Sequence, residues 1–302
     1  MHDTRNNVLK RWLLFGVWVA VSSLLFARPL VALVRLSLTN DDASYLILIP
    51  FLVAGLVFIE RRTIFNNLSF SAGGGIFLFL SVVIVLSVRL AGDKVAPDLR
   101  LTGNVLAVLL LWIAGFAFSF GKAAVKSAYF PLLFLFLTVP LPNFLLERVI
   151  SLLQAGSAEI TEVLFNLTGV PVLREGLVFR LARVNIEVAR ECSGIRSTIA
   201  LFILALPVVH YGLHSLWRKL FFLACAFSMM ILKNGIRIAT LTLLAMYVDP
   251  GFLTGKLHHQ GGIVFFLLGL LLLLPVLLLL QRGESSALAG RKESAASSEQ
   301  RN

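Results

Sequence analysis

Three short segments, far apart in the chain, carry side chains that could take part in covalent catalysis. Cys192 lies in RECSGIRST, Arg237 lies in LKNGIRIATL, and His258 and His259 lie in GKLHHQGG. A thiolate is a nucleophile, an imidazole transfers protons and a fixed guanidinium stabilises negative charge, so these are the parts needed for acyl transfer. The alternative from the residues alone is a buried structural cysteine that shares its side of the molecule with these residues by chance.

Cys192 stands directly before a long apolar stretch, and therefore at the start of an expected helix. Free N–H groups and the positive end of the helix dipole lower the pKa of a thiol at this position. Glu191 acts in the opposite direction, because a nearby carboxylate raises a thiol pKa. Arg196 follows by four residues and shares a helical face with Cys192, which makes it a candidate for positioning. The other cysteine, Cys225, lies among apolar residues and is interpreted as a small core residue.

A group of polar residues interrupts another apolar stretch, MILKNGIRIATLTLL. Lys233 and Arg237 are four residues apart and share a helical face, with Asn234 between them as a second positioning candidate. Charged residues inside an apolar span usually mark a functional site. Two alternatives remain open at this stage. The cations could extend to the interface or pair with glutamates, or they could bind an anionic head group in a transporter or flippase.

The two histidines are adjacent in a short loop, so their side chains point in different directions. A metal site would need further ligands, and the sequence offers none nearby. The sequence therefore indicates no metal and no cofactor, and either His258 or His259 could be the titratable group of a catalytic site.

The composition identifies the class of protein. The chain has 302 residues, of which 58% are hydrophobic, and a mean hydropathy of +0.89. Windows of about 20 residues without charge recur, as expected for membrane-spanning helices. The net charge of +11 is scattered through short loops, which is typical of cytoplasmic loops beside anionic lipid and excludes nucleic acid as the expected partner.

Eight spans are expected, and the loop charges orient them. The spans are roughly 12–34, 44–60, 73–90, 103–120, 127–143, 193–212, 219–248 and 261–281. With eight spans, the basic loops all fall on one side, so the positive-inside rule places both termini in the cytoplasm. Cys192 and the two histidines then face outward, near the outer surface of the membrane.

The remaining segments complete the expected fold, an all-α polytopic bundle in a single domain at 1–282. Residues 144–168 have helical periodicity interrupted by charge and predict an interfacial amphipathic helix. Residues 170–190 are rich in β-branched residues and predict a short outward β-hairpin, with a turn at REG or at LARVN. The polar tail, 283–302, is expected to be disordered and cytoplasmic.

The segments VNIEVARECSGIRSTIALF, LKNGIRIATL and LHHQGGIVFF, in this order, resemble the exosortase/archaeosortase family. The resemblance covers roughly residues 130–275. It implies a membrane cysteine transpeptidase or protease with Cys192 as the nucleophile and Arg237 as the catalytic arginine. The family histidine precedes a glycine by four positions, which selects His258 over His259.

The resemblance also implies the partners and the location. Substrates would be exported proteins with a C-terminal sorting signal, which consists of a short motif, a transmembrane helix and a basic cluster. The location would be the bacterial inner membrane, often alongside exopolysaccharide production. A third reading is an inactive scaffold, in which Cys192, Arg237 and the histidines are all dispensable. The substrate motif, the choice between hydrolysis and transpeptidation, the acceptor and the oligomeric state are left open.

Overall fold

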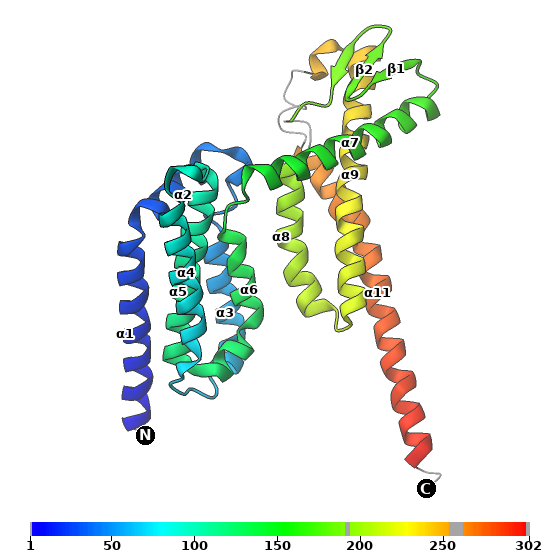
Figure 1. Ribbon diagram of the computed structural model, residues 1–302. Coiled ribbons are helices and arrows are strands. Elements are labelled where there is room, and N and C mark those ends of the chain that lie inside the picture. Colours follow the sequence, from blue (N-terminus) through cyan, green and yellow to red (C-terminus); the bar gives the residue numbers. More distant parts are fainter. Residues whose placement is uncertain (1, 191–193, 254–261, 300–302) are drawn as a thin grey trace. The chain divides into compact units, whose positions relative to one another are not determined.

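The computed structural model describes residues 2–190, 194–253 and 262–299. The chain forms two compact units, Met1–Leu146 and Glu147–Asn302, which are shown in Figure 1. Each unit contains its own clusters of buried apolar residues, so each has an independent core.

The first unit is a group of helices around α5. Its elements are α1 (His2–Leu25), α2 (Ala27–Thr39), η1 (Asp41–Ala43), α3 (Ile49–Ile64), η2 (Ala72–Gly74), α4 (Gly75–Ala91), η3 (Gly92–Lys94), α5 (Pro97–Ser127), α6 (Tyr129–Leu135) and η4 (Phe136–Thr138). Helix α5 packs against α1, α2, α3, α4 and α6. It is apolar on most sides, and a helix of this kind is stable only when neighbours surround it.

Aromatic residues join α1 to α5. Gly115 allows close approach, since a Cβ there would lie 2.2 Å from Cδ1 of Trp18. The Trp18 indole donates a hydrogen bond to the carbonyl oxygen of Leu111 over 2.7 Å. Trp12 and Phe15 add ring contacts with Phe120 at centroid distances of 4.9 and 5.5 Å. This apolar cluster fixes the position of the first span.

The first predicted span, 12–34, is broken in the structure. Helix α1 ends at Leu25 and α2 begins at Ala27, with Phe26 outside helical geometry. Pro29 explains the break, because proline has no N–H and its ring clashes with the carbonyl group four residues earlier, here that of Leu25. Proline is tolerated in the first turn of a new helix, which is its position in α2.

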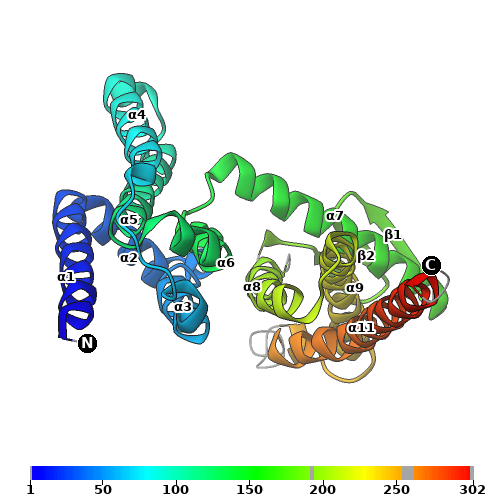
Figure 2. The same cartoon turned by 90° about the horizontal axis from the view of Figure 1, so that it is seen from below.

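The second unit contains every predicted site residue. Its elements are α7 (Asn143–Leu167, whose first turn precedes the boundary between the units), β1 (Val172–Glu175), β2 (Val178–Leu181), β3 (Asn185–Glu187), α8 (Ile195–Gly212), α9 (Leu216–Tyr247), η6 (Pro250–Leu253) and α11 (Gly262–Glu299). Helices α8 and α9 form an antiparallel hairpin, and α11 packs against both. Figure 2 shows these three helices from below as one group, with α11 running obliquely across the view.

The predicted β-hairpin is a three-stranded antiparallel sheet in the order β1-β2-β3. Both expected turns exist: one passes through Gly176, which has a φ of 66°, and the other lies between Leu181 and Asn185. Phe179 is fully buried and makes an edge contact with Phe165 of α7 at 5.7 Å. The sheet is therefore anchored on α7 through an apolar core.

The structure confirms the predicted fold class, an all-α polytopic protein with a small sheet. In the described part of the chain, six helices are long and apolar enough to cross a membrane, or seven if 129–167 counts as one broken span. Two of the eight predicted spans are shorter than expected. Helix α3 has 16 residues and α6 has 7, the latter because prolines in VPLPN separate it from α7.

The tail differs from its prediction. Helix α11 continues to Glu299, so 283–299 is helical rather than disordered. The segment extends an existing helix and does not need a new nucleus, which is the unfavourable step in helix formation. Its alanines, glutamates and basic residues also have good helix propensity.

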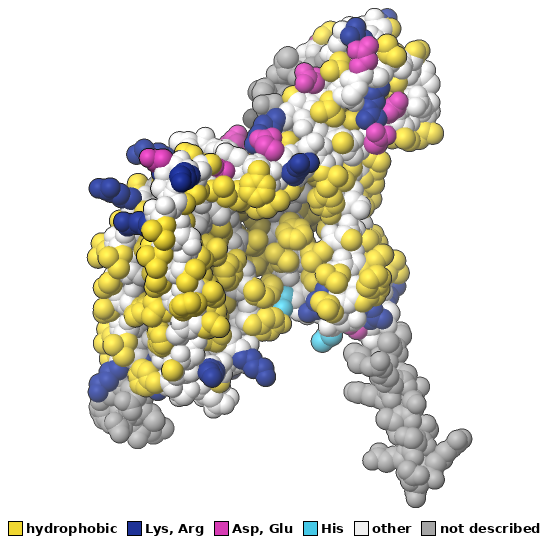
Figure 3. Space-filling view, in the orientation of Figure 1, with side chains coloured by type: hydrophobic (Ala, Val, Ile, Leu, Met, Phe, Trp, Pro, Cys, Tyr) yellow, Lys and Arg dark blue, Asp and Glu magenta, His cyan; other side chains and the backbone are white. Residues whose placement is uncertain are grey.

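The surface of each unit has the pattern of a membrane protein. In Figure 3 apolar side chains cover the middle of the helices, and Lys and Arg gather at the helix ends. Many large apolar side chains are exposed, including Leu24, Phe51 and Leu271 at 76%, 72% and 65%. Exposure of this extent requires a lipid environment.

Candidate active site

The predicted site residues fall into two groups. Arg196 lies in the first turn of α8, and Asn234 and Arg237 lie in the middle of α9. Cys192, His258 and His259 lie outside the described residues. The described residues therefore show the surroundings of the site: the beginning of α8, the polar residues of α9 and the helix α7 that packs against them.

Two polar side chains of α9 are almost completely buried. Lys233 and Asn234 are each 1% exposed. The Lys233 ammonium donates a hydrogen bond to Oγ of Ser197 in α8, and a Cβ at Gly269 of α11 would lie 3.8 Å from Cγ of Lys233. Lys233 therefore does not extend to the interface, which was one expectation for it. Its ammonium lies among α8, α9 and α11.

Helix α7 supplies polar partners to the same turn of α9. The Asn234 amide donates to Oγ of Ser157 over 3.0 Å. Thr161, one turn further along α7, donates to the carbonyl oxygens of Ser157 at 2.7 Å and Gly235 at 3.3 Å. A Cβ at Gly235 would lie 2.5 Å from Cγ2 of Ile160. Glycine is therefore required at position 235 for this close contact between the two helices.

The beginning of α8 is held against Asn234. Gly194 precedes the helix with a φ of 72°, a conformation that other residues adopt only with strain. Its carbonyl oxygen accepts bonds from Oγ of Ser197 and from the backbone N–H and Oγ1 of Thr198, each at 2.9 Å. A Cβ at Gly194 would lie 3.0 Å from Oδ1 of Asn234. Side-chain and backbone groups thus fix this turn on α9.

Arg237 lies one turn beyond Lys233 on α9. The side chain is partly buried, and its Nε atom is shielded from solvent. Arg196, in contrast, is exposed, whereas Ser197 and Thr198, the next two residues of α8, make the contacts near α9. Ser157, Thr161 and Ser197 were not among the predicted site residues. The four-residue spacing of Ser157 and Thr161 was a usable signal, because it places both on one face of α7.

The glutamates of α7 pair with arginines of the sheet region. Arg174 bonds Glu159 at 2.8 Å and Glu162 at 2.6 Å, and these hydrogen bonds raise the pKa of the Arg174 guanidinium. Arg190 bonds Glu147, and the Gln154 amide donates to the carbonyl oxygen of Val188 over 2.7 Å. These contacts fix residues 188–190, directly before Glu191 and Cys192 in sequence.

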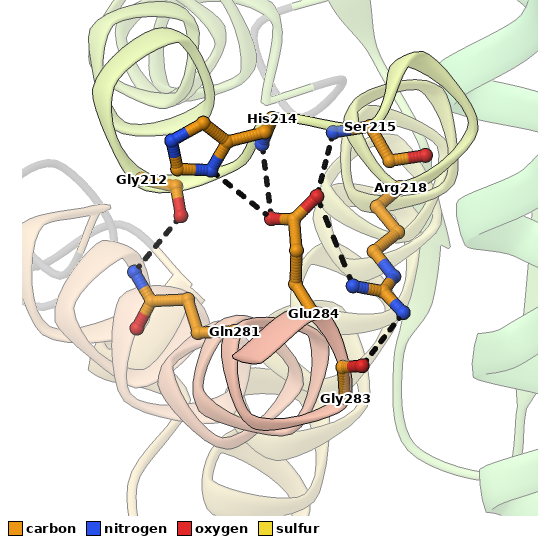
Figure 4. A network of polar contacts seen from close by, with 7 residues as sticks. All are labelled: Gly212, His214, Ser215, Arg218, Gln281, Gly283 and Glu284. Atoms are coloured by element: carbon orange, nitrogen blue, oxygen red, sulfur yellow. Dashed lines mark hydrogen bonds and ion pairs between the residues drawn. The ribbon is translucent and has the colours of Figure 1, made fainter. Parts of the chain in front are cut away.

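A second polar cluster lies at the other end of the α8–α9 hairpin (Figure 4). Glu284 of α11 is 8% exposed and accepts hydrogen bonds from the backbone N–H groups of His214 at 2.9 Å and Ser215 at 2.6 Å. Arg218 lies 3.8 Å from the same carboxylate and donates to the carbonyl oxygen of Gly283 over 2.9 Å. A carboxylate at the N-terminus of α9 also complements the helix dipole, so this cluster fastens the turn to α11.

The two clusters can do different chemistry. In the described part of the chain, Lys233 makes no ion pair and has a neutral hydroxyl as its partner, with Arg237 four residues away on the same helix. The Lys233 ammonium lies at the first turn of α8, and a cation near a helix N-terminus favours an anion there. The Glu284 carboxylate is already matched by donors and a cation. Of these two clusters, the one around Lys233 is the one in which the described partner of the buried charge is neutral.

Comparisons with known proteins identify the family. No curated protein and no solved structure matches the chain. A family model described as transmembrane exosortase (Exosortase_EpsH) matches residues 35–275, which include α8, α9 and most of the first unit as well as the region that the motifs covered. The match spans well over half of the chain. This multi-pass membrane protein therefore belongs to the transmembrane exosortase family.

Proposed function

We propose that the protein is a cysteine transpeptidase or protease that cleaves exported proteins at a C-terminal sorting signal. Cys192 is the nucleophile, Arg237 stabilises the developing negative charge, and His258 transfers the proton, with His259 as the alternative. The observation that carries the proposal is the polar layer of α9, which combines two buried or partly buried cations with the fixed beginning of α8.

Chain connectivity supports this arrangement. Cys192 precedes Gly194 by two residues, and consecutive Cα atoms are about 3.8 Å apart, so their Cα atoms are separated by at most about 8 Å. Gly194 itself packs on the side chain of Asn234. We therefore expect the Cys192 thiol to lie near the α8 N-terminus, whose free N–H groups and helix dipole favour the thiolate.

The reaction proceeds through a thioester. The Cys192 thiolate attacks the scissile carbonyl carbon, and the Arg237 guanidinium stabilises the oxyanion of the tetrahedral intermediate. The C–N bond breaks as the histidine donates a proton to the departing amine. An amine or a water molecule then attacks the thioester, and the thiolate leaves, which gives transpeptidation or hydrolysis respectively.

The orientation expected from the sequence suits a substrate that is anchored in the membrane. With the eight spans expected there, the positive-inside rule puts both termini in the cytoplasm and the start of α8 near the outer face of a bacterial inner membrane. A substrate helix with a cytoplasmic basic cluster would enter from the lipid and present its short motif to Cys192. Labelling with a membrane-impermeant thiol reagent from outside tests this orientation.

The decisive experiment compares the two cysteines of the chain. Cys192→Ala and Cys192→Ser should abolish processing of a tagged sorting-signal substrate, and Cys225→Ala, which changes a half-buried thiol in α9, should leave it intact. Mass spectrometry should find a substrate-derived thioester on Cys192 in the wild type alone. Normal processing by Cys192→Ala would refute the proposal, and if Arg237 were still required, a transporter that binds an anionic head group would become the better reading.

A further inference from the structure

Lys233 is a fully buried cation to which the reaction steps above assign no specific task. Its exposure is 1%, and it lies in the middle of α9, 14 residues (about 21 Å of helix rise) from Lys219 near the helix start. Burial of a charged ammonium costs several kcal/mol in effective terms unless it is compensated. A lysine retained at such a position therefore calls for a role that an apolar residue could not fulfil.

The immediate surroundings of Lys233 connect it to the beginning of α8. The ammonium donates to Oγ of Ser197, and that hydroxyl donates to the carbonyl oxygen of Gly194 over 2.9 Å. The chain of contacts runs from the ammonium through one hydroxyl to the residue before α8, two residues after Cys192 in sequence. Asn234, the next residue of α9, contacts Gly194 from the same helix. Both α9 residues thus act on the same short segment.

The chemistry of this link differs from that of an ordinary ion pair. The glutamates of α7 are bound by Arg174 and Arg190, and the described partner of Lys233 is neutral. The positive charge is therefore not cancelled by that partner, and burial strengthens its field at short range, because the local dielectric constant is lower than that of water. Arg237, one turn away, adds charge of the same sign. An anion that forms nearby would offset this cost.

We propose that Lys233 is a positioning residue of the catalytic centre: with Ser197 it fixes the first turn of α8 and supplies a second positive charge that favours the Cys192 thiolate. The proposal rests on the proposed function, since it requires Cys192 to be the nucleophile. It assigns different tasks to the two cations. Arg237 contacts the reacting oxyanion, and Lys233 acts through the helix start and through its charge.

The test measures the rate of iodoacetamide alkylation of Cys192 as a function of pH, in a Cys225→Ala background of the full-length protein. Loss of a neighbouring opposite charge shifts the pKa of an ionised group by about 1 unit or more. Lys233→Met should therefore move the alkylation midpoint upward by about one pH unit or more and slow processing about tenfold at neutral pH. Lys233→Arg should keep the alkylation midpoint close to that of the wild type, because arginine keeps the positive charge.

Stability separates this role from a purely structural one. Methionine is apolar and similar in length to lysine, and replacement of a buried charge by an apolar side chain is often neutral or stabilising. Lys233→Met should therefore unfold at the same temperature or higher, although its thiol is less acidic. Ser197→Ala, which removes the tether and keeps the ammonium, should give a smaller shift in the same direction. Lys219→Met on the same helix is the matched control and should change neither midpoint nor processing.

The failures can be told apart. If Cys192→Ala still processes substrate, the proposed function falls, and the role of Lys233 falls with it. If Cys192 is essential but the alkylation midpoint is the same in Lys233→Met and in the wild type, only the inference about Lys233 is wrong. Should Lys233→Met not fold, an unchanged midpoint in Ser197→Ala would overturn the inference in the same way.

Discussion

The polar clusters at the two ends of the α8–α9 hairpin differ in how charge is compensated. At the α8–α9 turn, Glu284 accepts hydrogen bonds from two backbone N–H groups and lies near Arg218. Its negative charge is therefore compensated by donors and by a cation. At the other end, the Lys233 ammonium has a neutral hydroxyl as its described partner. The comparison teaches that a buried charge matched by its partners stabilises a fold, whereas a buried charge held by a neutral group is available for chemistry.

The proposed difference between the two clusters would be wrong if Arg237 could be removed without loss of processing. Arg237→Ala should reduce the processing rate about 100- to 1000-fold, the usual effect of removing a donor to an oxyanion. Arg237→Lys should recover little, since lysine keeps the charge but loses the planar fork of the guanidinium. The measurement is the rate of substrate cleavage at saturating substrate. A rate within twofold of the wild type for either variant would remove Arg237 from the mechanism.

A pair of glycines sharpens the comparison. Gly194 and Gly176 have similar positive φ values, 72° and 66°, but only a Cβ at Gly194 would meet another residue, Asn234 at 3.0 Å, since nothing lies within 4 Å at Gly176. Both substitutions to alanine should cost about 1–2 kcal/mol of backbone strain. Gly194→Ala should also displace the start of α8 and lower processing about tenfold, by analogy with other small misplacements of catalytic groups.

The two alanine variants are compared by thermal unfolding in detergent and by processing rate. Similar unfolding temperatures with different rates would show that the contact between Gly194 and Asn234 positions the site. Equal rates for Gly194→Ala and Gly176→Ala would show that the beginning of α8 tolerates displacement, and would weaken the link between α9 and Cys192.

The Glu284 cluster should show the opposite behaviour, with an effect on stability alone. Glu284→Ala leaves the N–H groups of His214 and Ser215 without their acceptor and should lower the free energy of unfolding by about 1–3 kcal/mol. Glu284→Gln keeps an oxygen acceptor and should lose less. Processing at a temperature where both variants are folded should equal that of the wild type. A loss of processing without a loss of stability would mean that the two ends of the hairpin are coupled.

Much of the architecture could be predicted because lipid simplifies the physical problem. In the membrane every backbone polar group must be bonded within the helix, so apolar stretches of sufficient length report spans directly. The helical periodicity of 144–168 predicted the helix α7, and the β-branched residues of 170–190 predicted the strands. The break at Phe26 was missed because hydropathy averages over a window, whereas Pro29 acts on one hydrogen bond.

The polar residues of α9 could be selected from the sequence for a related reason. Arg237 and Asn234 were visible because charge and amide groups are rare inside apolar spans. Ser157, Thr161 and Ser197 could not be selected in the same way, since hydroxyls often bond their own helix backbone and occur throughout apolar segments. Their partners lie on other helices and are distant in sequence.

The amino-acid sequence by itself determined that the chain crosses a membrane, where its helices run, and which rare polar residues interrupt them. Only the tertiary structure decided which of these groups meet. Lys233 hydrogen-bonds Ser197, and Asn234 contacts Ser157 and Gly194. The glutamates of α7 form ion pairs with Arg174 and Arg190. The physical reason is that hydropathy is a property of each segment alone, whereas a hydrogen bond between helices depends on the rotation and depth at which they pack.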